Sequence, residues 1–211
     1  MIRAKIIFVK SKILLPAIFI LVFALSRIPG LMPWNFSVAY AFAFCAGVYF
    51  RGAVKWWLPL GVMLVTDVAL DVFYYHVSPF SYWLVLNYAI YAVIIGLGQW
   101  FGPRAGFFKL VLGGLLGAVL FYLVTNTLSW LQDPVYAKTI AGWIQALTIG
   151  HPDLHPSTWE LFRNTFLSTG LFTALFAGSA KAISAESPAD KTAGAREPEP
   201  EAKAEPEEAK A

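Results

Sequence analysis

Long apolar runs, broken by short polar connections, fill the chain from residue 13 to residue 183. A transmembrane helix needs about 20 apolar residues, and inside a bilayer its backbone polar groups must bond one another. Only 14% of the residues are charged, against about 25% in a soluble domain. The sequence therefore predicts an all-α integral membrane protein.

The runs predict six transmembrane helices that form one domain, residues 1–183. They lie at residues 13–26, 37–50, 56–75, 82–101, 110–131 and 161–183. The first two are short, so we expect little tilt, a locally thinned bilayer, or a compact bundle whose loops dip inward.

Charges at the ends of the runs predict the orientation, because Lys and Arg near span ends favour the cytoplasm. Nine basic residues fall on one side of the predicted helices, and only Arg27, Lys138 and Arg163 fall on the other. We therefore expect an inner-membrane protein with both termini in the cytoplasm, whose basic excess needs no nucleic acid to explain it. Alternatively, the basic start and the apolar run to Leu25 form a cleaved signal peptide, which would leave five helices.

The last segment, residues 184–211, differs sharply from the rest. It is rich in Ala, Pro, Glu and Lys, has no aromatic residue, and holds eight of the 13 acidic residues of the chain. Such a composition cannot bury enough apolar surface to offset its ordering entropy. We expect a disordered, acidic cytoplasmic tail.

Two carboxylates interrupt the third run, in the stretch TDVALDVFYYH. Asp67 and Asp71 are four residues apart, so on an α-helix they share one face. A helix that enters from the cytoplasm near Trp56 carries Asp67 about 16 Å along its axis, with Asp71 about 6 Å further out. A carboxylate at that depth costs about 2.5–3.5 kcal/mol, so both must face the bundle or a wet cavity.

Two interpretations of this pair stay open. In the first, the carboxylates form a proton site or bind a cationic or donor-rich small molecule. In the second they are a structural lock, satisfied by Arg163 on the sixth span or by Asn126 and Thr125 on the fifth.

Other polar residues give weaker signals. Asn87, Asn126 and Asn164 lie in apolar surroundings, where an unpaired amide is costly, so we expect each to bond another helix. Residues 140–148 form an amphipathic pattern in the longest loop, which predicts a helix at the outer interface that caps a cavity or covers the bundle. Tyr74 lies near the predicted outer end of the third span, where an aromatic belt is expected and a cation could be held.

Small residues on two spans mark close helix approaches. Gly113 and Gly117 form such a pair on the fifth span, and Ala39, Ala43 and Gly47 line the second. Each set favours internal packing or the docking of a partner.

Motifs for catalysis are missing from the sequence. There is no G-x-x-x-x-G-K-[ST] phosphate loop, no G-x-S-x-G and no H-E-x-x-H. His151, Asp153 and His155 suit a metal by residue type, yet the prolines of an exposed turn explain HPDLHP equally well. We predict no enzyme activity, no cofactor and no bound metal.

Several segments resemble an uncharacterised bacterial family of proposed transport proteins. These are RIPGLMPWNFSVAYAFAF, LPLGVMLVTDVALDVFYYH, VTNTLSWLQDPVYAKTIAGWIQALTIG and FRNTFLSTGLFTALFAG. That family is similar in turn to the substrate-binding S components of energy-coupling factor (ECF) transporters. The resemblance implies a six-helix S-component-like bundle that binds a vitamin or metal ion near its outer surface, under the first loop. It also implies an energising membrane partner with separate ATPase subunits.

The motifs of that family match this chain residue by residue only in part. Arg27, Pro29, Pro33, Asn35 and Phe36 stand where its first loop has its motif, although a His is missing. Asp71 stands where a Gly is usual, and the common Gly-Asp of the sixth span is Ser168 and Thr169 here. One acid of the cavity is therefore lost on the sixth span and one is gained on the third.

We therefore predict capture or carriage of a small, cationic or vitamin-like solute by a protein embedded in membrane lipid. The predicted substrate-binding residues are Asp67, Asp71, Asn35, Asn126, Arg163, Asn164 and Tyr74. The alternative is a non-transporting structural or interaction protein of the cell envelope.

Overall fold

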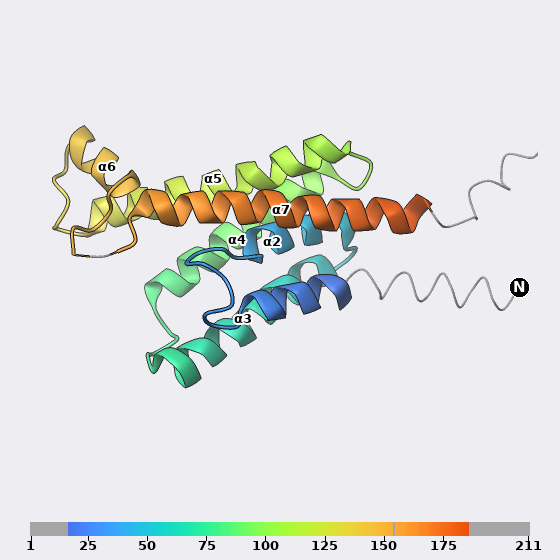
Figure 1. The fold of residues 1–211 in the computed structure, drawn as a ribbon, viewed down its shortest axis with the longest axis horizontal. Coiled ribbons are helices and arrows are strands. Elements are labelled where there is room, and N and C mark those ends of the chain that lie inside the picture. The colour runs from blue at the N-terminus through green and yellow to red at the C-terminus, as the bar shows by residue number, and fades with distance from the viewer. Residues whose placement is uncertain (1–16, 154, 186–211) are drawn as a thin grey trace, which may run out of the picture.

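The computed structural model describes residues 17–153 and 155–185, and over those residues it is built of helices without a strand (Figure 1). The first helix is described as Ala17–Ser26. It is followed by α2 (Ala39–Tyr49), α3 (Val54–Leu70), the π-helical turn η1 (Asp71–Tyr75), α4 (Tyr82–Phe101), α5 (Phe107–Gln132), α6 (Ile140–Leu147) and α7 (Thr158–Ala185). The predicted all-α class is confirmed. The signal peptide considered as an alternative and the predicted tail fall largely on residues 1–16 and 186–211, which lie outside the described residues.

Four helical segments of the described chain are long and apolar enough to cross a membrane, rather than the six expected. They are Val54–Tyr75, Tyr82–Phe101, Phe107–Gln132 and Thr158–Ile183. The expected second span contains only α2, whose 11 residues measure about 17 Å, roughly half the hydrocarbon thickness. The expected first span is described only over Ala17–Ser26, which is likewise short.

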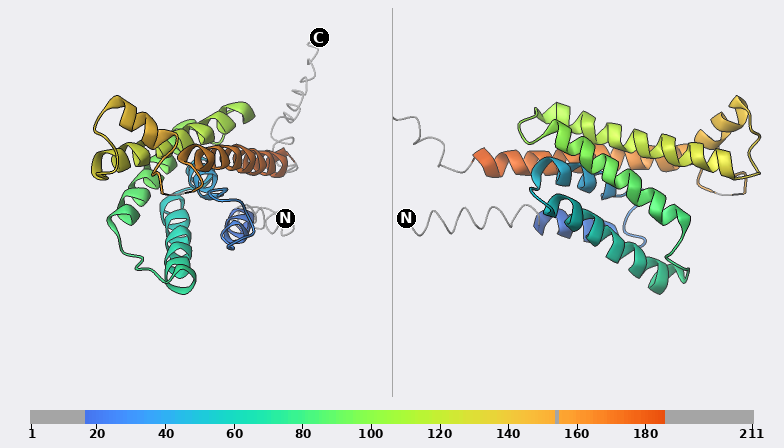
Figure 2. Two further views of the ribbon diagram at one scale, coloured as in Figure 1. Left: turned by 60° about the vertical axis from the view of Figure 1, so that its left-hand side comes forward. Right: turned by 180° about the vertical axis from the view of Figure 1, so that it is seen from behind.

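Helix α2 is the centre of the bundle. Every residue from Ala39 to Val48 is buried, and the helix packs on α3, α4, α5 and α7. Phe19 of the first helix also lies edge-on to Phe42 of α2, at 6.5 Å between ring centroids. Figures 1 and 2 show α3 and the first helix on one side of α2, with α5 and α7 on the other. A helix can be apolar all round when protein encloses it, so α2 needs no lipid contact.

Glycines allow α2 and α4 to touch backbone to backbone. A Cβ atom on Gly47 would lie 2.0 Å from the Ile95 carbonyl oxygen, and one on Gly98 would lie 2.1 Å from that of Phe44. On α5, a Cβ on Gly113 would lie 2.5 Å from the Phe44 ring. These small residues therefore serve packing inside the bundle, which was one of the two expected uses.

The two ends of the bundle differ. The described ends of the chain, near Ala17 and Ala185, lie at one end (Figures 1 and 2). The other end carries the loop between η1 and α4, helix α6 and the start of α7. Helix α6 confirms the expected short helix and is fixed to α5, because Trp143 Nε1 donates to Thr127 Oγ1 at 2.9 Å.

We predict that Gly98→Ala destabilises the fold by about 1–3 kcal/mol, because the new methyl group overlaps the Phe44 carbonyl. Gly96→Ala is the matched control on the same helix, since a Cβ there meets nothing within 4 Å. It should leave stability unchanged or raise it by up to about 1 kcal/mol. Thermal unfolding in detergent compares the two, and equal midpoints would contradict the close crossing of α2 and α4.

Candidate functional site

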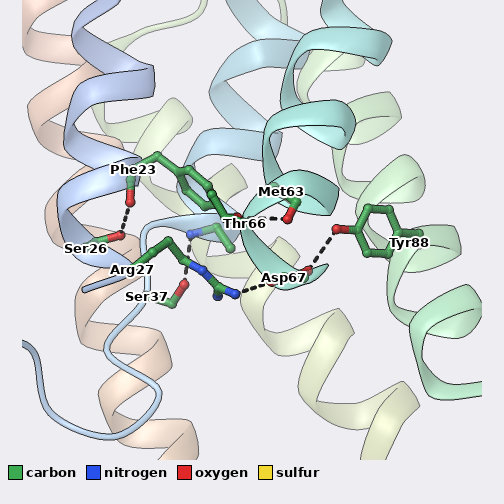
Figure 3. Close-up of polar contacts among 9 residues, drawn as sticks. Phe23, Ser26, Arg27, Ser37, Met63, Thr66, Asp67 and Tyr88 are labelled. Atoms are coloured by element: carbon green, nitrogen blue, oxygen red, sulfur yellow. Dashed lines mark hydrogen bonds and ion pairs between the residues drawn. The ribbon is translucent and has the colours of Figure 1, made fainter. Parts of the chain in front are cut away.

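Asp67, near the C-terminal end of α3, is held by two partners from different elements (Figure 3). Arg27, in the loop after the first helix, donates from Nη2 to Asp67 Oδ1 in an ion pair. Tyr88 of α4 donates its hydroxyl to Oδ2 at 2.8 Å. Both carboxylate oxygens are therefore engaged. The structural lock considered from the sequence had the wrong partners, because neither Arg163 nor Asn126 reaches Asp67.

Local structure aims Arg27 at Asp67. The first helix ends there, with Arg27 N–H donating to the Ala24 carbonyl at 3.1 Å. The guanidinium carbon lies 5.9 Å from the centre of the Phe23 ring, a distance at which a cation is attracted to the aromatic face. The Arg27 and Asp67 side chains are only 26% and 23% exposed, so water screens their attraction weakly.

The loop of residues 27–38, called the first loop below, is also tied to α7. Asn164 Nδ2 donates to the Trp34 carbonyl at 2.9 Å, and Thr165 Oγ1 donates to the Asn35 carbonyl at 3.2 Å. Asn35 has φ 57°, a left-handed conformation that Asn tolerates better than most residues. The first loop is thus pinned to α3 by Arg27 and to α7 by Asn164 and Thr165.

A cavity of about 390 Å³, called the central cavity below, lies between the first loop, α3, α4 and α5. Pro79 and Ser81 belong to its lining, so it extends to the end of the bundle that carries the loop between η1 and α4. Its other lining residues are Arg27, Asn35, Ser37, Tyr40, Asp67, Asp71, Trp83, Leu84, Asn87, Tyr91 and Phe121. Asp67 and Asp71 therefore do face the same space, as their spacing predicted.

Three polar side chains of this cavity have no protein partner within the described part of the chain. Asn35 comes from the first loop, Asp71 from η1 and Asn87 from α4, and none makes a side-chain hydrogen bond or ion pair there. The expectation that Asn87 bonds another helix is therefore wrong. Convergence of unpaired polar groups in a mostly apolar bundle is what a small-molecule site requires.

Asp71 is placed by an irregular helix end. It opens the π-helical turn η1, and its carbonyl accepts from the N–H groups of both His76 and Val77, the latter at 2.9 Å. Single π turns inside helices are frequent at functional sites. This irregular helix end places the Asp71 carboxylate at the wall of the central cavity and leaves it without a hydrogen-bond partner among the described residues.

Two further cavities adjoin the central one, and Asn35 borders all three. One of about 480 Å³ lies against the first loop and is lined by Arg27, Trp34, Tyr74 and Tyr75, among others. The other, of about 170 Å³, lies between α5 and α7. Asn126 borders that smaller cavity but donates to the Tyr122 carbonyl of its own helix at 2.8 Å, which corrects its expected bond to another helix.

The structure thus places the seven predicted site residues in different surroundings. Asp67, Asp71 and Asn35 line the central cavity, whereas Tyr74 and Asn126 line its neighbours. Asn164 supports the first loop. Arg163 is exposed and borders none of the three cavities.

Sequence reasoning missed Arg27, Tyr88 and Asn87 as residues of this site. Arg27 had a signal, since it is one of only three basic residues on the predicted outer side. Tyr88 is one of nine tyrosines, and no sequence signal distinguished it from the others.

The HPDLHP stretch offers little for a metal. His151 Nδ1 lies 3.8 Å from Asp153 Oδ2, whose side chain is 85% exposed. Over residues 17–153 and 155–185 there is no group of three or more His, Cys, Asp or Glu residues that could hold a metal ion.

Residues 8–190 match the model of a family described as a family of unknown function, DUF6580, and the chain belongs to that family. Searches of curated proteins and of solved structures found no match. Nothing in these comparisons links the chain to the S components of ECF transporters.

We predict that Arg27→Gln and Asp67→Asn each lower stability by about 1–3 kcal/mol, because each leaves a half-buried charge without its partner. The double variant should lose less than the sum of the two, since no unpaired charge remains. Arg163→Gln, at an exposed position, should change little. Thermal unfolding gives all four values, and strict additivity of the two substitutions would contradict the ion pair.

Proposed function

We propose that this protein binds a small polar solute in the central cavity, with Asp71 as its primary contact. One observation supports this most: three unpaired polar side chains from three elements meet in one cavity large enough for a small molecule. Asn35 is exposed, but Asp71 and Asn87 are half-buried, so their polar atoms need either water or a ligand to satisfy them.

The charges of the cavity favour a solute with a cationic or hydrogen-bond-donating group. Arg27 and Asp67 neutralise each other, so the carboxylate of Asp71 is the remaining charge among the lining residues. A carboxylate accepts hydrogen bonds only, and the nearby rings of Trp83 and Tyr91 also attract cations.

The direction of capture follows from the proposed orientation. The excess of basic residues favours termini in the cytoplasm, and the central cavity extends toward the end of the bundle opposite the described chain ends. The solute would then enter from outside, under the first loop, as in an S-component-like protein. Because the sequence has no phosphate-loop motif, active transport would need a separate energising membrane partner with ATPase subunits.

A second candidate function is a structural or interaction protein of the envelope that carries no solute. The contacts of Asp67 favour it, because Arg27 and Tyr88 satisfy both carboxylate oxygens and join the first loop, α3 and α4. Asp71, Asn35 and Asn87 are not explained by that function.

We predict that native mass spectrometry of the protein purified in mild detergent detects a small bound species. Asp71→Asn should lose it, because the substitution removes the unpaired carboxylate while leaving Arg27, Asp67 and Tyr88 in place. Asp153→Asn, which removes an exposed carboxylate in a loop, should retain it.

The result that contradicts the proposal is a bare wild-type spectrum together with no mass shift in lipid nanodiscs supplied with cell extract. The second candidate would then stand. Thermal melts of all three proteins establish that loss of the species is not loss of the fold.

A further inference from the structure

The Arg27 guanidinium has donors that Asp67 does not use. Only Nη2 is bonded to the carboxylate. Nε is buried without a partner, and within the described residues Nη1 makes no hydrogen bond either. A guanidinium carries five N–H donors in a fixed fork, and this one borders both the central cavity and the cavity against the first loop.

We propose that the solute is a small zwitterion of the amino-acid type, with its ammonium group on Asp71 and its carboxylate on Nη1 of Arg27. This inference rests on the proposed solute binding and adds the chemical class of the solute. Asp67 acts as a positioning residue, because it orients Arg27 and each of its own oxygens already accepts a hydrogen bond, from Arg27 or from Tyr88.

Electrostatics favour a zwitterion over a simple cation. Asp67 and Asp71 are one helical turn apart, a spacing of about 5–6 Å between Cβ atoms, and Arg27 is in contact with Asp67. A cation on Asp71 would therefore lie close to the guanidinium but could not bond its unused N–H groups, because both are donors. A carboxylate on the same solute accepts from those groups in a charge-assisted hydrogen bond.

The spacing also limits the size of the charged part. The two charged anchors, Arg27 and Asp71, both line the central cavity, and Arg27 is paired with Asp67, one helical turn from Asp71. This suits an ammonium and a carboxylate on the same or neighbouring carbon atoms. A diamine or a dicarboxylate would put a charge of the wrong sign at one of the two anchors.

Aromatic rings provide a wall for the rest of the solute. Tyr91 and Phe121 are stacked at 5.7 Å, and Tyr40 packs on Phe121 at 4.7 Å between ring centroids. All three line the central cavity. An apolar side chain of the solute gains by contact with these rings, while the free amides of Asn35 and Asn87 can bond its polar atoms.

The test measures binding of the standard amino acids to the full-length protein in detergent by isothermal titration calorimetry. The tightest binder is then compared with its amine, which lacks the carboxylate, and its acid, which lacks the amino group. Each analogue should bind at least about tenfold more weakly than the amino acid, the usual effect of losing a charge-assisted hydrogen bond.

The Arg27→Lys variant tests the Arg27 anchor independently of the Asp71 anchor. Lys keeps a positive charge for Asp67 but has no planar fork, so affinity for the amino acid should fall at least about tenfold, while affinity for the amine should stay within about twofold. Asp71→Asn should weaken both the amino acid and the amine, and Asp153→Asn neither. Should Arg27→Lys unfold the protein, the three ligands on the wild type decide the question alone.

The possible failures are distinguishable. An amine that binds as tightly as its amino acid, or a folded Arg27→Lys protein with wild-type affinity, overturns the zwitterion and leaves solute binding intact. The same holds if no amino acid binds although native mass spectrometry finds a species that depends on Asp71. Absence of any species and of any binding overturns both proposals.

Discussion

The ion pair between Arg27 and Asp67 is the interaction on which the candidate site depends. An isolated carboxylate within a bilayer costs about 2.5–3.5 kcal/mol, and Arg27, from the first loop, offsets that cost by pairing with Asp67. With Tyr88 as a third member, the pair connects the first loop, α3 and α4. The charge that it leaves unbalanced in the central cavity is that of Asp71.

The shortness of α2 explains why there is a cavity at all. A full span at this position would fill the middle of the bundle from one end to the other, but α2 begins only at Ala39. Ser37 and Tyr40, at its start, belong to the cavity lining. The space beyond them is covered by the first loop, which α7 holds through Asn164 and Thr165. The fold and the candidate site thus both depend on α2, a central helix that is enclosed by protein and does not need to reach both membrane surfaces.

Local patterns predicted the helices and part of the site. Apolar runs located α3, α4, α5 and α7, and the four-residue spacing of Asp67 and Asp71 put both at one cavity. The partner of Asp67 could not be predicted, because Arg27 is 40 residues away and reaches it through an irregular loop that no periodicity describes. The second run was predicted to span the membrane for a related reason: apolarity alone does not distinguish a helix in lipid from one enclosed by protein. Arg163 and Asn126 were predicted as partners of Asp67 from their depth in the membrane. Depth does not determine which way a side chain faces.

The most direct test is the accessibility of the central cavity to water from one side of the membrane. The chain has one cysteine, Cys45, and it is buried at 1% exposure, so introduced cysteines can be followed with a membrane-impermeant maleimide in right-side-out vesicles. Asp71→Cys and Asn87→Cys should react in the intact membrane, whereas Ala43→Cys, at a fully buried position of α2, should react only after unfolding. If Asp71→Cys and Asn87→Cys also react only after unfolding, the cavity is closed to solute and the account is wrong.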